Sequence, residues 1–91
     1  MIETRHLVIS GLVQGVGFRY AMAAQARLLG IGGWVRNRRD GSVEAMIAGD
    51  AGQIEEMLAW SRTGPSGAEV DRVAVEIGDG EYPGFELRAS V

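Results

Sequence analysis

An α+β sandwich, with two helices on one face of an antiparallel sheet, is the fold that this sequence predicts. Apolar and polar residues alternate in several short stretches, which is the period of a half-buried strand. Two longer stretches carry apolar residues at helical spacing. Glycine-rich connections separate these stretches. Because 91 residues suit a single compact unit, we expect one domain spanning residues 1–91.

The first half of the chain predicts a strand, a glycine loop and a helix. Residues 7–11 alternate in the strand pattern, and the loop occupies residues 13–19. A helix from about residue 20 to residue 29 follows, and Gly30 is expected to cap its end. Two neighbouring apolar stripes of this helix are expected to face the sheet: Ala21, Ala24 and Leu28, and beside them Met22, Ala26 and Leu29.

The second half predicts a hairpin, a second helix and two further strands. Asp40-Gly41 is a tight-turn signal between two strand patterns, and Asp50 is placed to cap the second helix. The strands are expected at 33–38, 42–47, 73–77 and 85–87. The inward stripe of the second helix is Ile54, Met57, Leu58 and Ser61. The resulting order is βαββαβ plus a short C-terminal strand, which is the ferredoxin-like split βαβ arrangement.

The composition excludes several kinds of chemistry. There is no cysteine, so no disulfide, thiolate metal site or cysteine nucleophile is available, and a cytoplasmic location is expected. All nine basic residues are arginines, so lysine Schiff-base chemistry is also excluded. The single histidine, His6, cannot build a poly-histidine metal site. The net charge of −3 argues against nucleic acid as a partner, and no apolar run is long enough to span a membrane.

The stretch from Gln14 to Arg19 is the first candidate site. Two glycines, Gly15 and Gly17, allow a tight loop whose backbone N–H groups point into one concavity. The helix that follows adds the positive end of its dipole, and Arg19 adds a planar fork of donors. An arginine at a helix start is disfavoured unless an anion lies nearby. The pattern therefore fits a phosphate cradle, although glycines that merely turn the chain would also explain it.

Asn37 is the second candidate, three residues before the predicted turn. A polar residue near a hairpin end is common for structural reasons alone. Its side-chain amide, however, carries both a donor and an acceptor, so it can hold a water molecule beside a phosphoryl oxygen. The arginines around it read equally as a phosphate-attracting rim or as an ordinary charged edge: Arg36, Arg38 and Arg39.

These motifs resemble the acylphosphatase family. The matching motifs are Gly11-x-Val13-Gln14-Gly15-Val16-Gly17-Phe18-Arg19, Gly33-Trp34-Val35-x-Asn37 and Asp40-Gly41-x-Val43. Shorter ones follow at Gly64-Pro65, Val70-x-x-Val73 and Phe85-x-Leu87-Arg88, so the resemblance runs from about residue 5 to residue 89. Relatives often carry a leucine where this chain has Ser61, a position expected to affect packing and not the site.

The resemblance implies hydrolysis of the carboxyl–phosphate bond of a small-molecule acyl phosphate, with no metal or organic cofactor. It assigns Arg19 to phosphate binding and catalysis, and Asn37 to orienting the attacking water. It assigns the phosphate-binding loop to Gln14, Gly15, Val16, Gly17 and Phe18, ending at Arg19. We expect a monomer.

Three other functions fit parts of the pattern. A non-catalytic domain that binds phosphate or another anion would share the loop, and only Asn37 distinguishes it. An RNA-binding domain shares the βαββαβ order, but it would need aromatic residues on the central strands, which are absent at 7–11 and 43–47. The chain also resembles the N-terminal domain of larger carbamoyl-handling maturation proteins; we expect a stand-alone enzyme.

Overall fold

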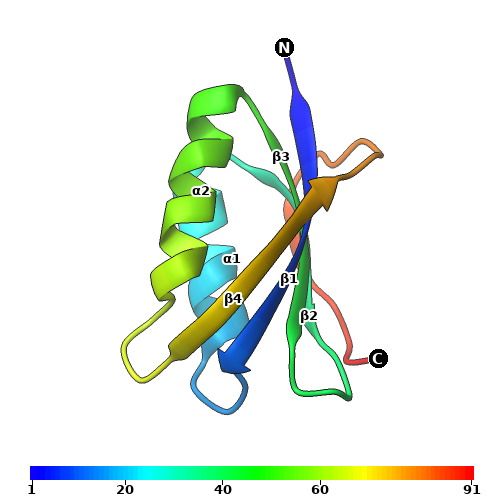
Figure 1. Cartoon of the computed structure of the whole chain (residues 1–91). Helices are drawn as coiled ribbons and strands as arrows, with labels where there is room; N and C mark the ends of the chain where they lie inside the picture. Colours follow the sequence, from blue (N-terminus) through cyan, green and yellow to red (C-terminus); the bar gives the residue numbers. More distant parts are fainter.

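A computed structural model describes all residues of the chain, 1–91. Two helices pack side by side on one face of a five-stranded sheet, and the other face of the sheet is left open (Figure 1). The elements are β1 (Glu3–Leu12), α1 (Phe18–Leu29), β2 (Gly32–Asn37), β3 (Val43–Gly49), α2 (Ala51–Thr63), β4 (Glu69–Ile77) and β5 (Phe85–Leu87). This arrangement confirms the predicted ferredoxin-like α+β fold.

The sheet has the strand order β4-β1-β3-β2-β5, and it is mixed. Neighbouring strands are antiparallel except that β5 pairs with β2 in parallel, which differs from the expected antiparallel sheet. The reason is the direction of the chain. Strand β4 ends at the same end of the sheet at which β2 begins (Figure 1). The loop 78–84 crosses the sheet at this end and reaches the start of β2. β5 then has to run in the same direction as β2.

Helix α1 begins two residues earlier than predicted, and this moves its buried face. Phe18, Met22 and Ala26 follow one another at four-residue spacing and are buried, as is Ala23. The predicted stripe of Ala21, Ala24 and Leu28 is wrong, since Ala24 and Leu28 are exposed. Phe18 is the largest buried side chain of the helix, so its burial sets which face of the helix turns to the core. Gly30 caps the end as expected, with a left-handed backbone.

Helix α2 follows the sequence prediction closely. The Asp50 side chain accepts a hydrogen bond from the N–H of Gln53, and the Gln53 side chain accepts one from the N–H of Asp50. This reciprocal capping box fixes the first turn. Ile54, Met57 and Ser61 are buried, and Leu58 is half-buried. The Ser61 hydroxyl donates to the carbonyl of Met57 at 2.8 Å, so this polar residue is satisfied in the core.

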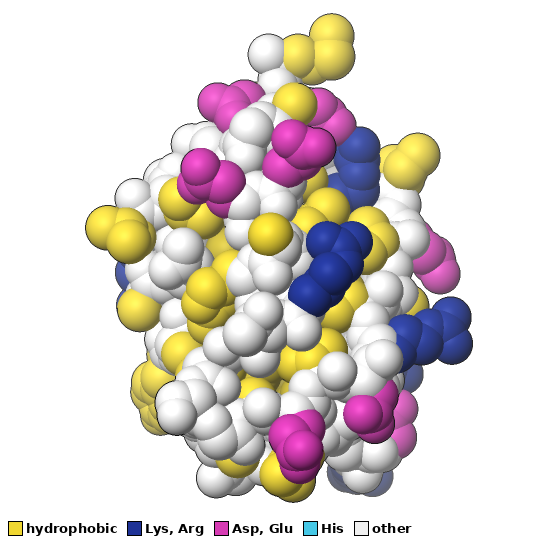
Figure 2. Space-filling view, turned by 60° about the vertical axis from the view of Figure 1, so that its left-hand side comes forward, with side chains coloured by type: hydrophobic (Ala, Val, Ile, Leu, Met, Phe, Trp, Pro, Cys, Tyr) yellow, Lys and Arg dark blue, Asp and Glu magenta, His cyan; other side chains and the backbone are white.

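The core lies between the helices and the sheet and includes Leu7, Ile9, Val35, Ala45 and Ile47. Neither helix is long and apolar enough to cross a bilayer. Figure 2 turns the helix side of the molecule forward. Acidic side chains gather at the two ends of this face, with scattered arginines between them, so the face carries no continuous basic surface.

Candidate active site

The two candidate segments lie at the same end of the sheet. Strand β3 runs antiparallel to both β1 and β2, so β1 and β2 run in the same direction. Their carboxyl ends therefore lie together, with the loop after β1 and the turn after β2 side by side at the lower end of Figure 1. The fold thus brings the predicted phosphate loop and Asn37 to one end of the sheet, although Arg19 and Asn37 are 18 positions apart in sequence.

The glycine loop presents unpaired backbone donors. Gly15 and Gly17 both have φ of 76°, in the left-handed region, and Gly17 is the N-cap of α1. No side chain caps this helix and no acidic residue lies in its first turn. The N–H groups of Gly15, Val16 and Gly17 donate to no other backbone group. Free N–H groups at the start of a helix are an arrangement that binds anions.

Arg19 lies in the first turn of this helix and is half-buried. Its side chain takes part in none of the hydrogen bonds or ion pairs of the structure. Its guanidinium lies 5.9 Å from the centre of the Tyr20 ring. Its five N–H donors are therefore free, and a half-buried cation at the positive end of a helix dipole is stabilised by a bound anion.

Asn37 is the last residue of β2 and lies opposite Val43 of β3. Side chains alternate along a strand, so Asn37 shares the helix-covered face with buried Val35. Its side chain is half-buried and makes no hydrogen bond within the protein, which leaves the amide donor and acceptor available. Its backbone is held on both sides, by the pairing with Val43 and by the N–H of Val91, which donates to its carbonyl at 3.0 Å.

The side chain of Gln14 binds the turn after β2, a contact that the sequence did not indicate. Its Nε2 donates to the carbonyl of Arg38 at 2.7 Å and to the carbonyl of Ser42 at 2.9 Å. Both N–H bonds of the amide are used in this way, so only the backbone N–H of Gln14 remains as a donor for the loop. No local pattern could have revealed these bonds, because the partners are 24 and 28 residues away in sequence.

The turn after Asn37 is fixed by its own hydrogen bonds. The Ser42 hydroxyl and backbone N–H both donate to Oδ1 of Asp40, at 2.6 and 2.9 Å. These bonds, the hydroxyl first, lower the pKa of Asp40 from its ordinary value of 3.8. Beside the turn is a hollow of about 360 Å³ lined by Arg38, Arg39, Asp40 and Val91. Two of the three predicted rim arginines, Arg38 and Arg39, therefore line this hollow.

Arg36 and His6 lie on the opposite, open face of the sheet. Nε of Arg36 donates to Oε1 of Glu44 at 2.7 Å, and Nε2 of His6 lies 2.7 Å from Oε2 of the same carboxylate. The guanidinium of Arg36 also stacks on Trp34 at 4.7 Å, with Arg88 on the same ring at 4.8 Å. Arg36 is thus committed to a structural cluster, and Trp34, 6% exposed, is a packing residue.

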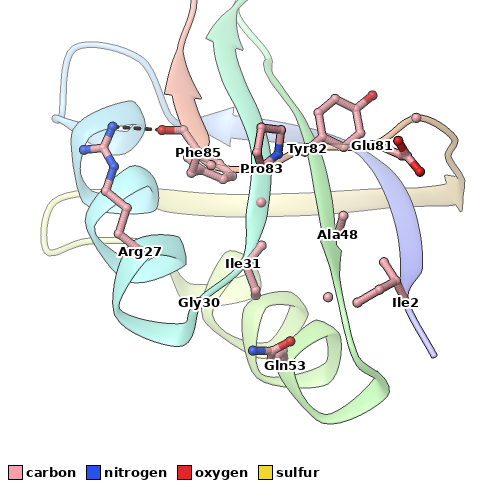
Figure 3. A pocket seen from close by; sticks show the side chains of 14 residues that line it. Ile2, Arg27, Gly30, Ile31, Ala48, Gln53, Glu81, Tyr82, Pro83 and Phe85 are labelled. Atoms are coloured by element: carbon pink, nitrogen blue, oxygen red, sulfur yellow. Dashed lines mark hydrogen bonds between the residues drawn. The ribbon is translucent and has the colours of Figure 1, made fainter.

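A larger cavity of about 850 Å³ lies at the other end of the sheet, where β2 begins. Figure 3 shows Arg27 of α1, Gln53 of α2 and the loop around Tyr82 on its sides, with Ile31 between them. Two of its polar side chains are engaged: Arg27 donates to the carbonyl of Phe85, and Gln53 bonds to Leu29 and Asp50. None of the predicted site residues lines it.

Comparisons with known proteins agree with the fold and with the motifs. The sequence model of the acylphosphatase family matches residues 5–87. An acylphosphatase of Albidiferax ferrireducens is 51% identical over 87 residues, covering 96% of this chain and 95% of that relative. One of Thiobacillus denitrificans is 49% identical and covers 97% and 99%. The structure of an acylphosphatase from Coxiella burnetii has a TM-score of 0.91 and 35% identity, covering 96% of this chain and 93% of that one.

The five-stranded sheet, its two helices and the glycine loop that leads into α1 define a ferredoxin-like α+β protein. The family match spans nearly the whole chain, and relatives of almost equal length are about half identical to it. The chain therefore belongs to the acylphosphatase family, and it is an enzyme of that family.

Proposed function

We propose that this chain hydrolyses the carboxyl–phosphate bond of small acyl phosphates, with Arg19 and Asn37 as its catalytic residues. The observation that carries this proposal is the half-buried, unpaired guanidinium of Arg19 beside a loop of free backbone N–H groups. Three positive features converge there without a counter-charge: the cation, the helix dipole and the N–H groups. A phosphoryl group supplies the matching negative charge.

In the proposed mechanism the loop and Arg19 hold the phosphoryl group. The loop runs from Gln14 to Phe18 and contributes backbone N–H groups. The planar guanidinium of Arg19 grips two phosphoryl oxygens and stabilises the charge that shifts among them in the transition state. The Asn37 amide holds the attacking water in line with the leaving carboxylate. The new bond forms between water oxygen and phosphorus, and the bond from phosphorus to the acyl oxygen breaks.

The proton of the water passes to a phosphoryl oxygen of the substrate in this mechanism. Asn37 is not a base at ordinary pH. The carboxylate of Glu44 and the imidazole of His6 lie on the other face of the sheet and bind each other. The leaving group is a stable carboxylate that needs no protonation, so binding, orientation and charge stabilisation suffice for the reaction. The products are a carboxylate and inorganic phosphate.

Phosphate release from benzoyl phosphate, by the unaltered protein and by Asn37→Ala, tests this function. We expect turnover by the unaltered protein and a loss on the order of 100-fold or more in Asn37→Ala. The affinity for inorganic phosphate should stay nearly unchanged, because the loop and Arg19 are intact. Near-normal turnover by Asn37→Ala would remove the water-orienting role. Phosphate binding without turnover by the unaltered protein would favour the alternative, a non-catalytic anion-binding module.

We propose that the protein acts in the cytoplasm as a monomer on a small-molecule substrate. Every residue with a proposed role comes from one chain, so the site is complete without a second copy. The open face of the central strands β1 and β3 carries no phenylalanine, tyrosine or tryptophan, which disfavours an RNA-binding role. The net charge of −3 disfavours it further.

A further inference from the structure

We propose that Gln14 is a positioning residue that holds the phosphate loop and Asn37 at a fixed separation. This inference rests on the proposed function for its effect on turnover, and on hydrogen bonds of the structure for the contact itself. Gln14 belongs to the loop, and its amide reaches across to the turn after β2. The two halves of the site are thereby joined through one side chain.

The partners of Gln14 flank Asn37 on both sides of the hairpin. Arg38 follows Asn37 directly, and Ser42 precedes Val43, which lies opposite Asn37 in the sheet. The N–H of Arg38 also donates to the carbonyl of Ser42, at 2.9 Å. The amide of Gln14 therefore binds both carbonyls of the first residue pair beyond Asn37. A shift of Gln14 would displace the backbone adjacent to Asn37.

The bridge lies where the sheet no longer joins the two segments. Pairing between β1 and β3 ends at Ile9 and Val43, and residues Ser10 to Leu12 pair only with β4. A bulge between Ser10 and Gly11 marks the same point. No backbone hydrogen bond connects the loop with residues 37–43, and the two bonds of Gln14 are the only side-chain bonds that do so.

The chemistry of the amide separates positioning from phosphate binding. Glutamine has two N–H donors on Nε2, and both are used on the carbonyls. Its remaining side-chain group is an oxygen, which accepts hydrogen bonds and would repel a phosphoryl oxygen. The side chain of Gln14 therefore acts through the turn that carries Asn37. In-line attack depends on a fixed separation between the water and phosphorus, and an error of about 1 Å can cost on the order of 100-fold in rate.

The test compares Gln14→Met with Gln14→Lys. Methionine keeps the length and volume of glutamine but has no donor, so both carbonyls lose their bonds. We expect kcat for benzoyl phosphate to fall by about 10- to 100-fold, with inhibition by inorganic phosphate changed by less than about threefold. Lysine has a side chain long enough to reach both carbonyls with its ammonium donors, and we expect it to recover most of kcat.

Gln25→Met is the matched control. Gln25 lies on α1 and is half-buried, and its side chain makes no hydrogen bond, so the same chemical change there should leave kcat as it is. Normal kcat in Gln14→Met would overturn the proposal. So would a large loss of phosphate affinity with kcat preserved, since that result would show direct binding by the amide. A Gln14→Lys variant as slow as Gln14→Met would also contradict it.

Hydrogen exchange and NMR follow the contact without turnover. In Gln14→Met we expect faster exchange of the Arg38 amide and shifted resonances of the Asn37 side-chain NH₂, relative to the unaltered protein and to Gln25→Met. Unchanged signals at both residues would overturn the positioning role. An unaltered protein that binds phosphate but releases none from benzoyl phosphate would refute the proposed function alone, and these signals would still decide the role of Gln14.

Discussion

Arg36 and Glu44 lie directly opposite each other on β2 and β3, and Nε of Arg36 donates to Oε1 of Glu44 at 2.7 Å. The other carboxylate oxygen faces His6 of β1, so one acid joins three strands on the open face. Burial alone would raise the pKa of Glu44. The hydrogen bonds from Arg36 and His6 outweigh that effect and lower the pKa below its ordinary value of 4.5.

Because the pKa of Glu44 is lowered in the folded protein, the free energy of unfolding depends on pH in the acidic range. The stabilising contribution of Glu44 is fully present above pH 4.5 and is lost as the pH falls through the lowered value in the folded protein. We expect Glu44→Gln to cost about 1–3 kcal/mol at neutral pH and to weaken the acid dependence. Urea unfolding between about pH 7 and about pH 3 measures both effects. Parallel stability curves for the two proteins would contradict the prediction.

Gly33 is predicted to be irreplaceable for a steric reason. Its φ is +138°, and a Cβ built there would lie 1.8 Å from the carbonyl oxygen of Met46 on the neighbouring strand. Neither atom can move without breaking the β2–β3 pairing. We expect Gly33→Ala to cost about 3 kcal/mol or more, at the upper end for one substitution.

Gly84→Ala is the control for this effect, because Gly84 lies near the same strand but a Cβ there would meet nothing within 4 Å. Its cost should stay within about 0.5 kcal/mol. Thermal or urea unfolding of both variants measures the two losses of stability. Equal stabilities of the two variants would show that β3 can yield at Met46.

Most of the fold could be predicted because its signals are local. Asp50 and Gln53 form a capping box within one turn, and Asp40-Gly41 marks the hairpin within two residues. Of the two stripes predicted for α1, the one with Met22 and Ala26 is buried, and the one with Ala24 and Leu28 is wrong. The helix rotation depends on Phe18, which sequence spacing placed in the loop. The parallel pairing of β5 depends on where β4 ends, which is a property of the whole sheet.

The site could be predicted only as two separate segments. The glycines and Arg19 are adjacent in sequence, and their geometry follows from a loop that enters a helix. That Asn37 lies at the same end of the sheet follows from the strand directions once the fold class is known. The amide of Gln14 joins the segments through bonds 24 and 28 residues apart, so only the folded structure reveals them.

Arg19 is expected to be required for both phosphate binding and turnover. Its guanidinium is free in the structure, so removing it breaks no internal bond, and Arg19→Ala should fold normally. We expect a loss on the order of 100- to 1,000-fold in turnover. Arg19→Lys should also lose most of the activity, because an ammonium cannot reproduce the planar fork.

Arg72→Ala is the control for charge alone, since Arg72 is exposed on β4 and makes no ion pair. It should keep normal phosphate affinity and turnover. Phosphate titration followed by NMR, together with turnover of benzoyl phosphate, compares the three variants. Full activity in Arg19→Lys would mean that a point charge suffices and that the bidentate grip is not used.

The effect of the loop glycines on phosphate binding can be separated from their effect on stability. Gly17 has φ of 76°, and a Cβ there would meet nothing within 4 Å, so alanine strains the backbone without a clash. Gly67, in the turn after α2, has φ of +93° and equally open surroundings. Both Gly17→Ala and Gly67→Ala should therefore lose about 1–2 kcal/mol of stability.

Gly17→Ala and Gly15→Ala should weaken phosphate binding, because the strain at these positions turns the loop N–H groups away from the bound anion. Gly67→Ala should leave phosphate binding unchanged. A tenfold rise in the phosphate dissociation constant corresponds to about 1.4 kcal/mol and is readily measured by NMR titration. Equal phosphate affinity in all three variants would show that the loop contributes no N–H groups to the anion. Phosphate would then depend on Arg19 alone, and the cradle would be only a tight turn between β1 and α1.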